Sequence, residues 1–208
     1  KAVEFHTTLN PAIWEGDKMK ADVRYKLMMI AKQFIEFIGV ESLALRDITI
    51  SGSNAAFAYT KYSDVDLHLI VEIDEDACEG TFEELFNAKK SLWNDKHNIT
   101  IHGFDVEVYV QKFGQPHVSA GIYSILNGKW LAKPEAIRPD IDDVSVHAKI
   151  QYLASKINDA LSSSSLQDVE STIDYIKNLR KAGLEKYGEF GAENIAYKTI
   201  RNAGLLEK

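Results

Sequence analysis

The stretch "SDVDLHLIVEI" (residues 63–73) constrains the fold more than any other part of the sequence. It reads as a buried β-strand, yet it carries two aspartates. Asp64 and Asp66 are two residues apart, so they project from the same face of the strand, whereas Val65 and Leu67 point into the core. A buried carboxylate without a partner costs several kcal/mol. Something must therefore neutralise the two aspartates.

The sequence around this strand predicts an α+β fold. Apolar residues spaced three and four apart predict an amphipathic helix over 18–38, and Gly39 follows as its stop. The hairpin signals are Gly103 within 98–110 and Asn127-Gly128 within 121–134, the latter favouring a type I′ turn. The other predicted elements are a strand at 43–51, a short helical turn in "NAAFAY" and a helix at 82–95.

From about residue 142 the pattern becomes helical to the end of the chain. Pro134 and Pro139 mark the break before it. We therefore predict two domains: a small mixed β-sheet packed by helices (1–140) and a helical C-terminal domain (141–208). Lys177, Arg180 and Lys181 in the latter form a basic patch at helical spacing, a pattern that usually belongs to a solvated face.

Composition excludes several classes of protein. The 208 residues carry a formal net charge of −7, which disfavours binding of long duplex DNA. The single cysteine, Cys78, excludes an internal disulfide. No apolar run approaches the roughly 20 residues that span a bilayer. We expect a soluble, cytoplasmic protein without a membrane partner.

A Gly-Ser pair lies directly after the strand that precedes the aspartates. Gly52 lets the backbone approach a phosphate closely, and the Ser53 hydroxyl and neighbouring amides can donate to it. The economical partner for Asp64 and Asp66 is a divalent cation, since Mg²⁺ prefers oxygen ligands and commonly uses carboxylates together with substrate phosphates. We therefore expect a metal site and a phosphate site next to each other.

The order of hydrophobic strand, Gly52-Ser53 and Asp64-Val-Asp66-Leu resembles the signature of the polymerase-beta-like nucleotidyltransferase superfamily. The wider text, from "TTLNPAIW" to "YSILNGKW", is similar to small members of that superfamily found in phages. The resemblance implies that the Gly-Ser turn holds a nucleoside triphosphate such as ATP. It also implies that the two aspartates hold two Mg²⁺ ions, for which Mn²⁺ can substitute.

The resemblance also implies a third carboxylate on a neighbouring strand. "FDVEVYVQ" (104–111) supplies two candidates on one face, Asp105 and Glu107. Glu107 is favoured because it is flanked by apolar residues, and Asp105 stays the alternative. Lys61 and Ser63 are further candidates for nucleotide binding, although a solvated loop lysine explains Lys61 equally well.

The leading functional hypothesis is an enzyme that transfers a nucleoside monophosphate from an NTP to an acceptor hydroxyl and releases pyrophosphate. Acceptors that stay open are a small molecule, another nucleotide, an RNA end or a protein side chain. The alternative is a non-catalytic nucleotide- or metal-sensing module on the same fold.

Overall fold

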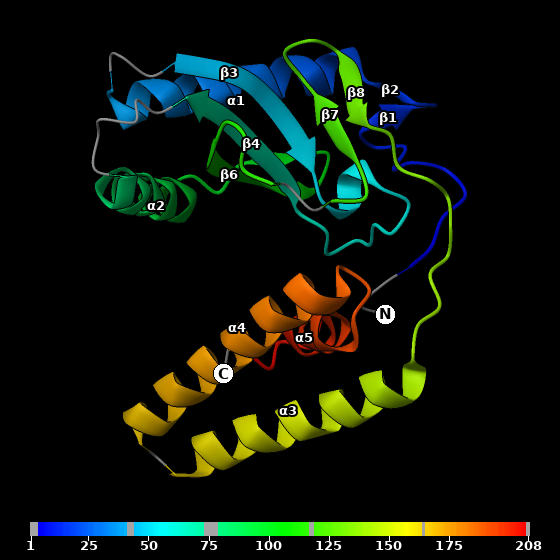
Figure 1. The fold of residues 1–208 in the computed structure, drawn as a ribbon, viewed down its shortest axis with the longest axis vertical. Coiled ribbons are helices and arrows are strands. Elements are labelled where there is room, and N and C mark those ends of the chain that lie inside the picture. Colours follow the sequence, from blue (N-terminus) through cyan, green and yellow to red (C-terminus); the bar gives the residue numbers. More distant parts are fainter. Residues whose placement is uncertain (1–3, 41–43, 73–78, 117–118, 164, 207–208) are drawn as a thin grey trace. The chain divides into compact units, whose positions relative to one another are not determined.

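The computed structural model describes residues 4–40, 44–72, 79–116, 119–163 and 165–206. The chain forms two compact units, one of Phe5–Ala136 and one that contains the residues from Ile137 onward. The first holds a mixed sheet with helices and the second is helical (Figure 1). The predicted α+β class is confirmed. The division into a domain of residues 1–140 and a domain of residues 141–208 stays a prediction, and Cys78 lies outside the described residues.

A six-stranded sheet organises the first unit, with the strand order β5-β6-β4-β3-β7-β8. β4 and β6 are parallel, and the other neighbouring strands are antiparallel. The strands are β3 (Ala44–Ser51), β4 (Val65–Glu72), β5 (Thr100–Ile101), β6 (Phe104–Lys112), β7 (Ile122–Ser124) and β8 (Lys129–Ala132). The predicted strands at 43–51 and 63–73 are confirmed over most of their length.

The core lies on one face of this sheet and is covered by helix α1 (Ala21–Ile38), which Figure 1 shows running along the strands. The buried side of α1 packs in the same core as the apolar residues of β4, which alternate with polar ones along the strand. Gly39 ends the helix in the left-handed conformation, as predicted. The helix starts later than residue 18 because Lys18–Met19 forms strand β2, which pairs with β1 (Trp14–Glu15).

Helix α2 (Glu79–Lys96) covers the open edge of β6. The Asn94 side chain donates to the Val108 carbonyl at 3.3 Å and accepts from the Val108 amide at 3.2 Å. These two bonds replace a neighbouring strand there, so the amide and carbonyl are not left open for pairing with another chain.

The two hairpins form, the first around Gly103 as predicted, but the turn of the second differs from the prediction. β5 and β6 are joined by His102 and Gly103, which both have positive φ (51° and 87°). Between β7 and β8 only Gly128 does, so the predicted type I′ turn at Asn127-Gly128 is wrong. The Ser124 hydroxyl accepts from the Asn127 amide at 3.0 Å and from its side chain at 2.9 Å, which stabilises a longer loop instead.

Three helices form the second unit: α3 (Asp143–Ser163), α4 (Leu166–Tyr187) and α5 (Ala192–Asn202). A small apolar core around Leu153, Ile176 and Ile200 joins them. Gly183 of α4 packs so closely on α5 that a β-carbon there would overlap Glu193. Glu193 in turn pairs with Lys149 of α3 at 2.7 Å.

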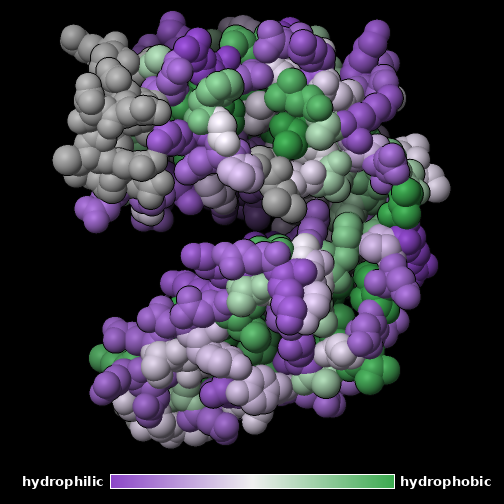
Figure 2. Space-filling model, viewed as in Figure 1, coloured by the Kyte–Doolittle hydropathy of each residue, from purple (hydrophilic) through white to green (hydrophobic). Residues whose placement is uncertain are grey.

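No helix within the described ranges is long and apolar enough to cross a membrane. The face of the molecule seen in Figure 2 is mostly hydrophilic, with hydrophobic residues in small patches. A short 3-10 helix, η1 (Ser53–Ala55), occupies part of the predicted turn in "NAAFAY" and leads to the candidate site.

Candidate active site

The strand directions bring the predicted site residues together where β3 ends and where β4 and β6 begin. β3 ends at Ser51, which is opposite Asp66 in the antiparallel register, and Asp66 is opposite Glu107 in the parallel register. Residues that are directly paired in a sheet project from the same face. Asp66 and Glu107 therefore lie next to each other on neighbouring strands.

That face of the sheet is polar, in contrast to the core face. Val65, Leu67 and Val108 are completely buried against the helices. The residues between them, Asp66 and Glu107, are half-buried. The alternation that predicted a strand with one buried face is thus confirmed, and the carboxylates are exposed to solvent in part.

Asp64 directly precedes β4 and is anchored through its backbone. The Asn54 side chain donates to the Asp64 carbonyl at 3.0 Å. Asn54 is completely buried, and its own oxygens accept from Asn10 (2.8 Å) and from the Trp14 indole (2.7 Å). This network fixes the loop between the Gly-Ser turn and the aspartates, since each buried polar group in it has a partner.

Gly52 lies against Asp66. Its backbone (φ 75°, ψ −164°) is in a region that only glycine adopts readily, and a β-carbon there would overlap Asp66 Oδ2. The Gly52 amide donates to Ser119 Oγ at 3.1 Å. The predicted proximity of the Gly-Ser turn and the carboxylates is therefore found in the structure, although this amide already has an acceptor.

Ser53 and Ser63 are brought together by the loop. The Ser53 hydroxyl donates to Ser63 Oγ at 2.7 Å, and the Thr60 amide donates to the same oxygen at 2.9 Å. Ser63 is buried, so its hydroxyl holds the loop closed. Lys61 is exposed, with its ammonium 4.8 Å from the centre of the Tyr62 ring. Among the described residues, no ion pair joins Lys61 to a carboxylate of the site.

The two candidates for the third carboxylate differ in their surroundings. Asp105 is exposed and pairs with Thr100 at the outer strand β5. Glu107 is half-buried, faces Asp66, and accepts a short hydrogen bond from the Tyr109 hydroxyl. This geometry favours Glu107.

Tyr109 is a site residue that the sequence interpretation missed. Burial, the Asp66 carboxylate and the hydrogen bond to Glu107 raise its pKa far above the usual range, with Asp64 adding to the effect. The hydroxyl therefore stays protonated and remains a donor to Glu107. Because all three carboxylates act on this one group, they lie within electrostatic reach of a common point. Tyr109 is two residues after Glu107, and this spacing, which places both on one face of a strand, could have indicated it from the sequence.

Lys90 of α2 supplies a cation to this face. Its ammonium lies 4.1 Å from the centre of the Tyr109 ring. Burial lowers the pKa of Lys90, although the Glu107 and Asp66 carboxylates act in the opposite direction. No local sequence pattern indicated this lysine, because only the packing of α2 on β6 brings it to the site.

His68 belongs to the same face. Its Nε2 is 3.0 Å from Ser51 Oγ, and its ring stacks on Tyr109 with centroids 5.0 Å apart. These contacts indicate a structural role for His68, because they join side chains of β3, β4 and β6 on this face.

In the parts of the chain that the structure describes, no three His, Cys, Asp or Glu side chains are gathered closely enough to hold a metal ion as they stand. The donor set of Asp64, Asp66 and Glu107 nevertheless consists only of carboxylate oxygens on one polar face, as Mg²⁺ and Mn²⁺ require. The chemistry of the donors fits these ions.

No protein-family model matches the chain, and no curated protein matches its sequence. Among solved structures, it is similar to the STING-associated CdnE c-di-GMP synthase from Capnocytophaga granulosa, with a TM-score of 0.28 and 14% identity. The match covers 95% of this chain and 65% of the synthase, so the chain spans less than two thirds of that protein.

Proposed function

We propose that this chain is a metal-dependent nucleotidyltransferase that moves a nucleoside monophosphate from an NTP to an acceptor hydroxyl and releases pyrophosphate. The observation that carries the proposal is the register of Asp66 with Glu107, with Gly52 packed against Asp66. A glycine turn that packs directly on one of two adjacent carboxylates places a candidate phosphate-binding backbone next to candidate metal ligands, which is the arrangement that nucleotide chemistry needs.

Asp64, Asp66 and Glu107 would hold the Mg²⁺ ions, with Mn²⁺ as a substitute. Bound there, two such ions supply Lewis acidity that lowers the pKa of the acceptor hydroxyl and stabilises the charge of the departing pyrophosphate. The carboxylates repel one another when no cation lies between them. Tyr109 and Lys90 offset part of that repulsion, since one donates to Glu107 and the other is attracted by Glu107 and Asp66.

The protein side chains have separate roles in the transfer. The acceptor oxygen attacks the α-phosphorus, the bond from that phosphorus to the bridging oxygen breaks, and the electron pair leaves with pyrophosphate. The acceptor proton passes to a carboxylate oxygen of Glu107, whose second oxygen is held by Tyr109. The Ser53 hydroxyl, now directed at Ser63, turns to donate to a phosphate oxygen.

The candidate substrates follow from charge and size. The NTP, for example ATP, binds at the Gly52-Ser53 turn, and Ser63 supports that turn from behind. A net charge of −7 favours an acceptor smaller than a long DNA duplex: a small molecule, a nucleotide, an RNA end or a protein hydroxyl.

The experiment is incubation of the chain with each α-labelled NTP, Mg²⁺ or Mn²⁺ and a panel of these acceptors. We expect the label to appear on an acceptor, with an equal amount of pyrophosphate. Asp66→Asn should abolish the transfer. The matched control is Glu72→Gln, a change at the far end of the same strand, which should leave it unchanged.

The alternative proposal is a sensing module that binds a nucleotide or a metal without turnover. It would be favoured by saturable, metal-dependent NTP binding that Asp66→Asn removes, with no pyrophosphate released across the whole panel.

A further inference from the structure

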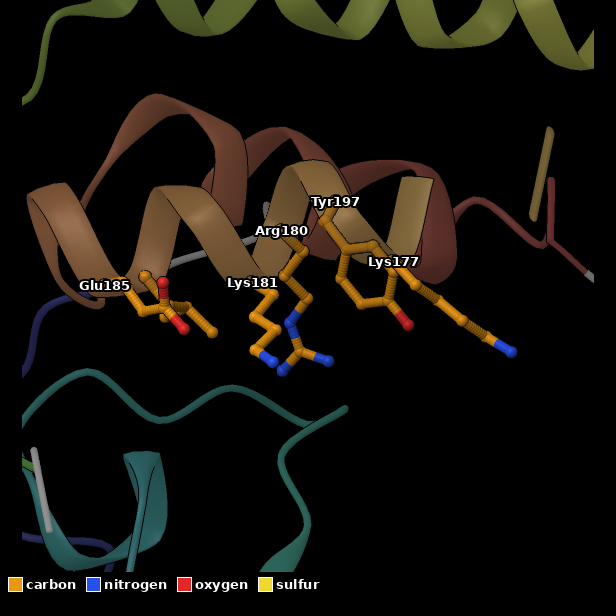
Figure 3. A pocket seen from close by; sticks show the side chains of 6 residues that line it. Lys177, Arg180, Lys181, Glu185 and Tyr197 are labelled. Atoms are coloured by element: carbon orange, nitrogen blue, oxygen red, sulfur yellow. The ribbon is translucent and has the colours of Figure 1, made fainter. Parts of the chain in front are cut away.

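The helical unit contains a hollow that the proposed transfer does not use. It has a volume of about 250 Å³ and opens on α4 and α5. Figure 3 shows the side chains around it: Lys177, Arg180, Lys181, Leu184, Glu185 and Tyr197. All six belong to the helical unit.

Three of these side chains are cations and one is an acid. Lys177 precedes Arg180 by three residues and Lys181 by four on α4, so its charge repels both of theirs. In Figure 3 the charged ends of Arg180 and Lys181 point to the same side of the helix. Within the described residues, no carboxylate forms an ion pair with Lys177 or Lys181.

Two residues of α5 hold the Arg180 side chain in place. Its Nε donates to Asn194 Oδ1 at 3.2 Å, and its guanidinium lies 4.4 Å from the centre of the Tyr197 ring. Asn194 is itself 1% exposed and donates to the Glu189 carbonyl at 2.7 Å. In the described part of the chain, the two terminal nitrogens of Arg180 find no acceptor, so their donors are available to a ligand.

We propose that this hollow is an anion site that binds the phosphate groups of a phosphate-bearing ligand. A planar guanidinium in a fixed orientation suits the bidentate recognition of phosphate. The ammonium groups of Lys177 and Lys181 add positive charge and, because their stems are flexible, can approach a phosphate from several directions. The volume is below the roughly 300–1,000 Å³ of sites that enclose a whole drug-sized ligand. The hollow therefore suits a phosphate or a short polyphosphate, and the rest of the ligand lies outside it.

The phosphate can come from a free polyphosphate compound or from the backbone of a single-stranded nucleic acid. Both present closely spaced anionic oxygens to the same three cations. They differ in salt dependence, because a strand that contacts several cations at once releases more counterions than one small anion does.

The first experiment is a calorimetric titration of the full chain with inorganic tripolyphosphate, in EDTA so that no divalent ion is present. We expect saturable binding. The double variant Arg180→Gln/Lys181→Gln should bind at least about tenfold more weakly, which equals about 1.4 kcal/mol. Lys186→Gln changes the same charge on the same helix but does not line the hollow, and it should bind as the wild type does.

Because Arg180 also contacts Asn194 and Tyr197, the double variant is compared with Lys181→Gln alone, since the Lys181 side chain forms no hydrogen bond or ring contact with any residue that the structure describes. Weaker binding in Lys181→Gln, at unchanged circular dichroism, supports the site. No saturable binding by the wild type, or equal affinity in the wild type and both variants, overturns it.

The second experiment repeats the titration with a short single-stranded RNA at two salt concentrations. A tighter, strongly salt-dependent association that the same variants weaken assigns the phosphate to a nucleic-acid backbone, and an affinity no higher than that of tripolyphosphate assigns it to a free polyphosphate compound. Asp66→Asn should leave both titrations unchanged, so failure of this site and failure of the proposed transferase are separate results.

Discussion

The Asp66 carboxylate occupies the space that a side chain on Gly52 would need. The two residues are on different segments, one at the end of β3 and the other in β4, and the antiparallel register brings them together. This packing ties the turn proposed to hold a phosphate to a carboxylate proposed to hold a metal.

Gly52→Ala should therefore affect both the stability and the activity. The backbone conformation, which only glycine adopts readily, would cost roughly 1–3 kcal/mol with any other residue. The new methyl group would also displace Asp66. We expect a lower midpoint of chemical unfolding and loss of transfer. Gly114→Ala, at a positive φ with nothing near its β-carbon, is the control for backbone strain alone. Unchanged transfer in Gly52→Ala would separate the turn from the site.

The third carboxylate is tested by comparing two neighbours on β6. Glu107→Gln should reduce turnover by orders of magnitude, because Glu107 faces Asp66 across the parallel pair. Asp105→Asn should cost little, since Asp105 is exposed and pairs with the outer strand. Turnover at saturating Mn²⁺ is the measurement, and equal losses in the two variants would refute separate roles.

Tyr109 is predicted to position Glu107. Tyr109→Phe keeps the ring against Lys90 and His68 but removes the hydroxyl that donates to Glu107. We expect kcat to fall about tenfold, which corresponds to about 1.4 kcal/mol, the net value of a hydrogen bond to a charged group. KM for the NTP should change little. A kcat equal to that of the wild type would show that Glu107 needs no such donor.

The helical unit should lose stability in acid through Glu193. Burial opposes its ionisation, but the hydrogen bond and charge of Lys149 outweigh this, and the pKa of Glu193 falls below its usual 4.5. Since the folded-state pKa is the lower one, the contribution is fully present above about pH 4.5 and is lost as the pH falls through the folded value.

Thermal unfolding as a function of pH measures this effect. Glu193→Gln should be less stable than the wild type at neutral pH, because the ion pair with Lys149 is gone. The difference should shrink as the pH falls below about 4.5. A difference that stays constant down to low pH would show that the carboxylate charge is not what stabilises the unit.

Much of the fold follows from local patterns in the sequence. The alternation in β4 placed Asp66 on the polar face, and Gly39 ended α1 where expected. Turn geometry was less predictable, because the Ser124 side chain stabilises a longer loop than Asn127-Gly128 alone would form. His102-Gly103 took the two positive φ values instead.

Most of the site residues predicted from the sequence are close together in it, and Glu107 was predicted only because the resemblance to the nucleotidyltransferases implies a third carboxylate. Asp64, Asp66 and the preceding Gly-Ser turn form one motif, so their spacing, together with the resemblance to the nucleotidyltransferases, indicated them. Lys90 reaches the site through the packing of α2, and Asn54 through contacts with Asn10 and Trp14. Such long-range contacts leave no periodic signal in a single sequence.

Direct measurement of Mn²⁺ binding tests whether Asp66 helps to hold a metal ion, and it requires no knowledge of the acceptor. The free ion is measured by electron paramagnetic resonance as it is titrated into the wild type, Asp66→Asn and the control Glu72→Gln, each with a non-hydrolysable NTP analogue. We expect saturable binding by the wild type and the control, and at least about tenfold weaker binding by Asp66→Asn. Equal Mn²⁺ affinity in all three proteins, or none in the wild type, would contradict it.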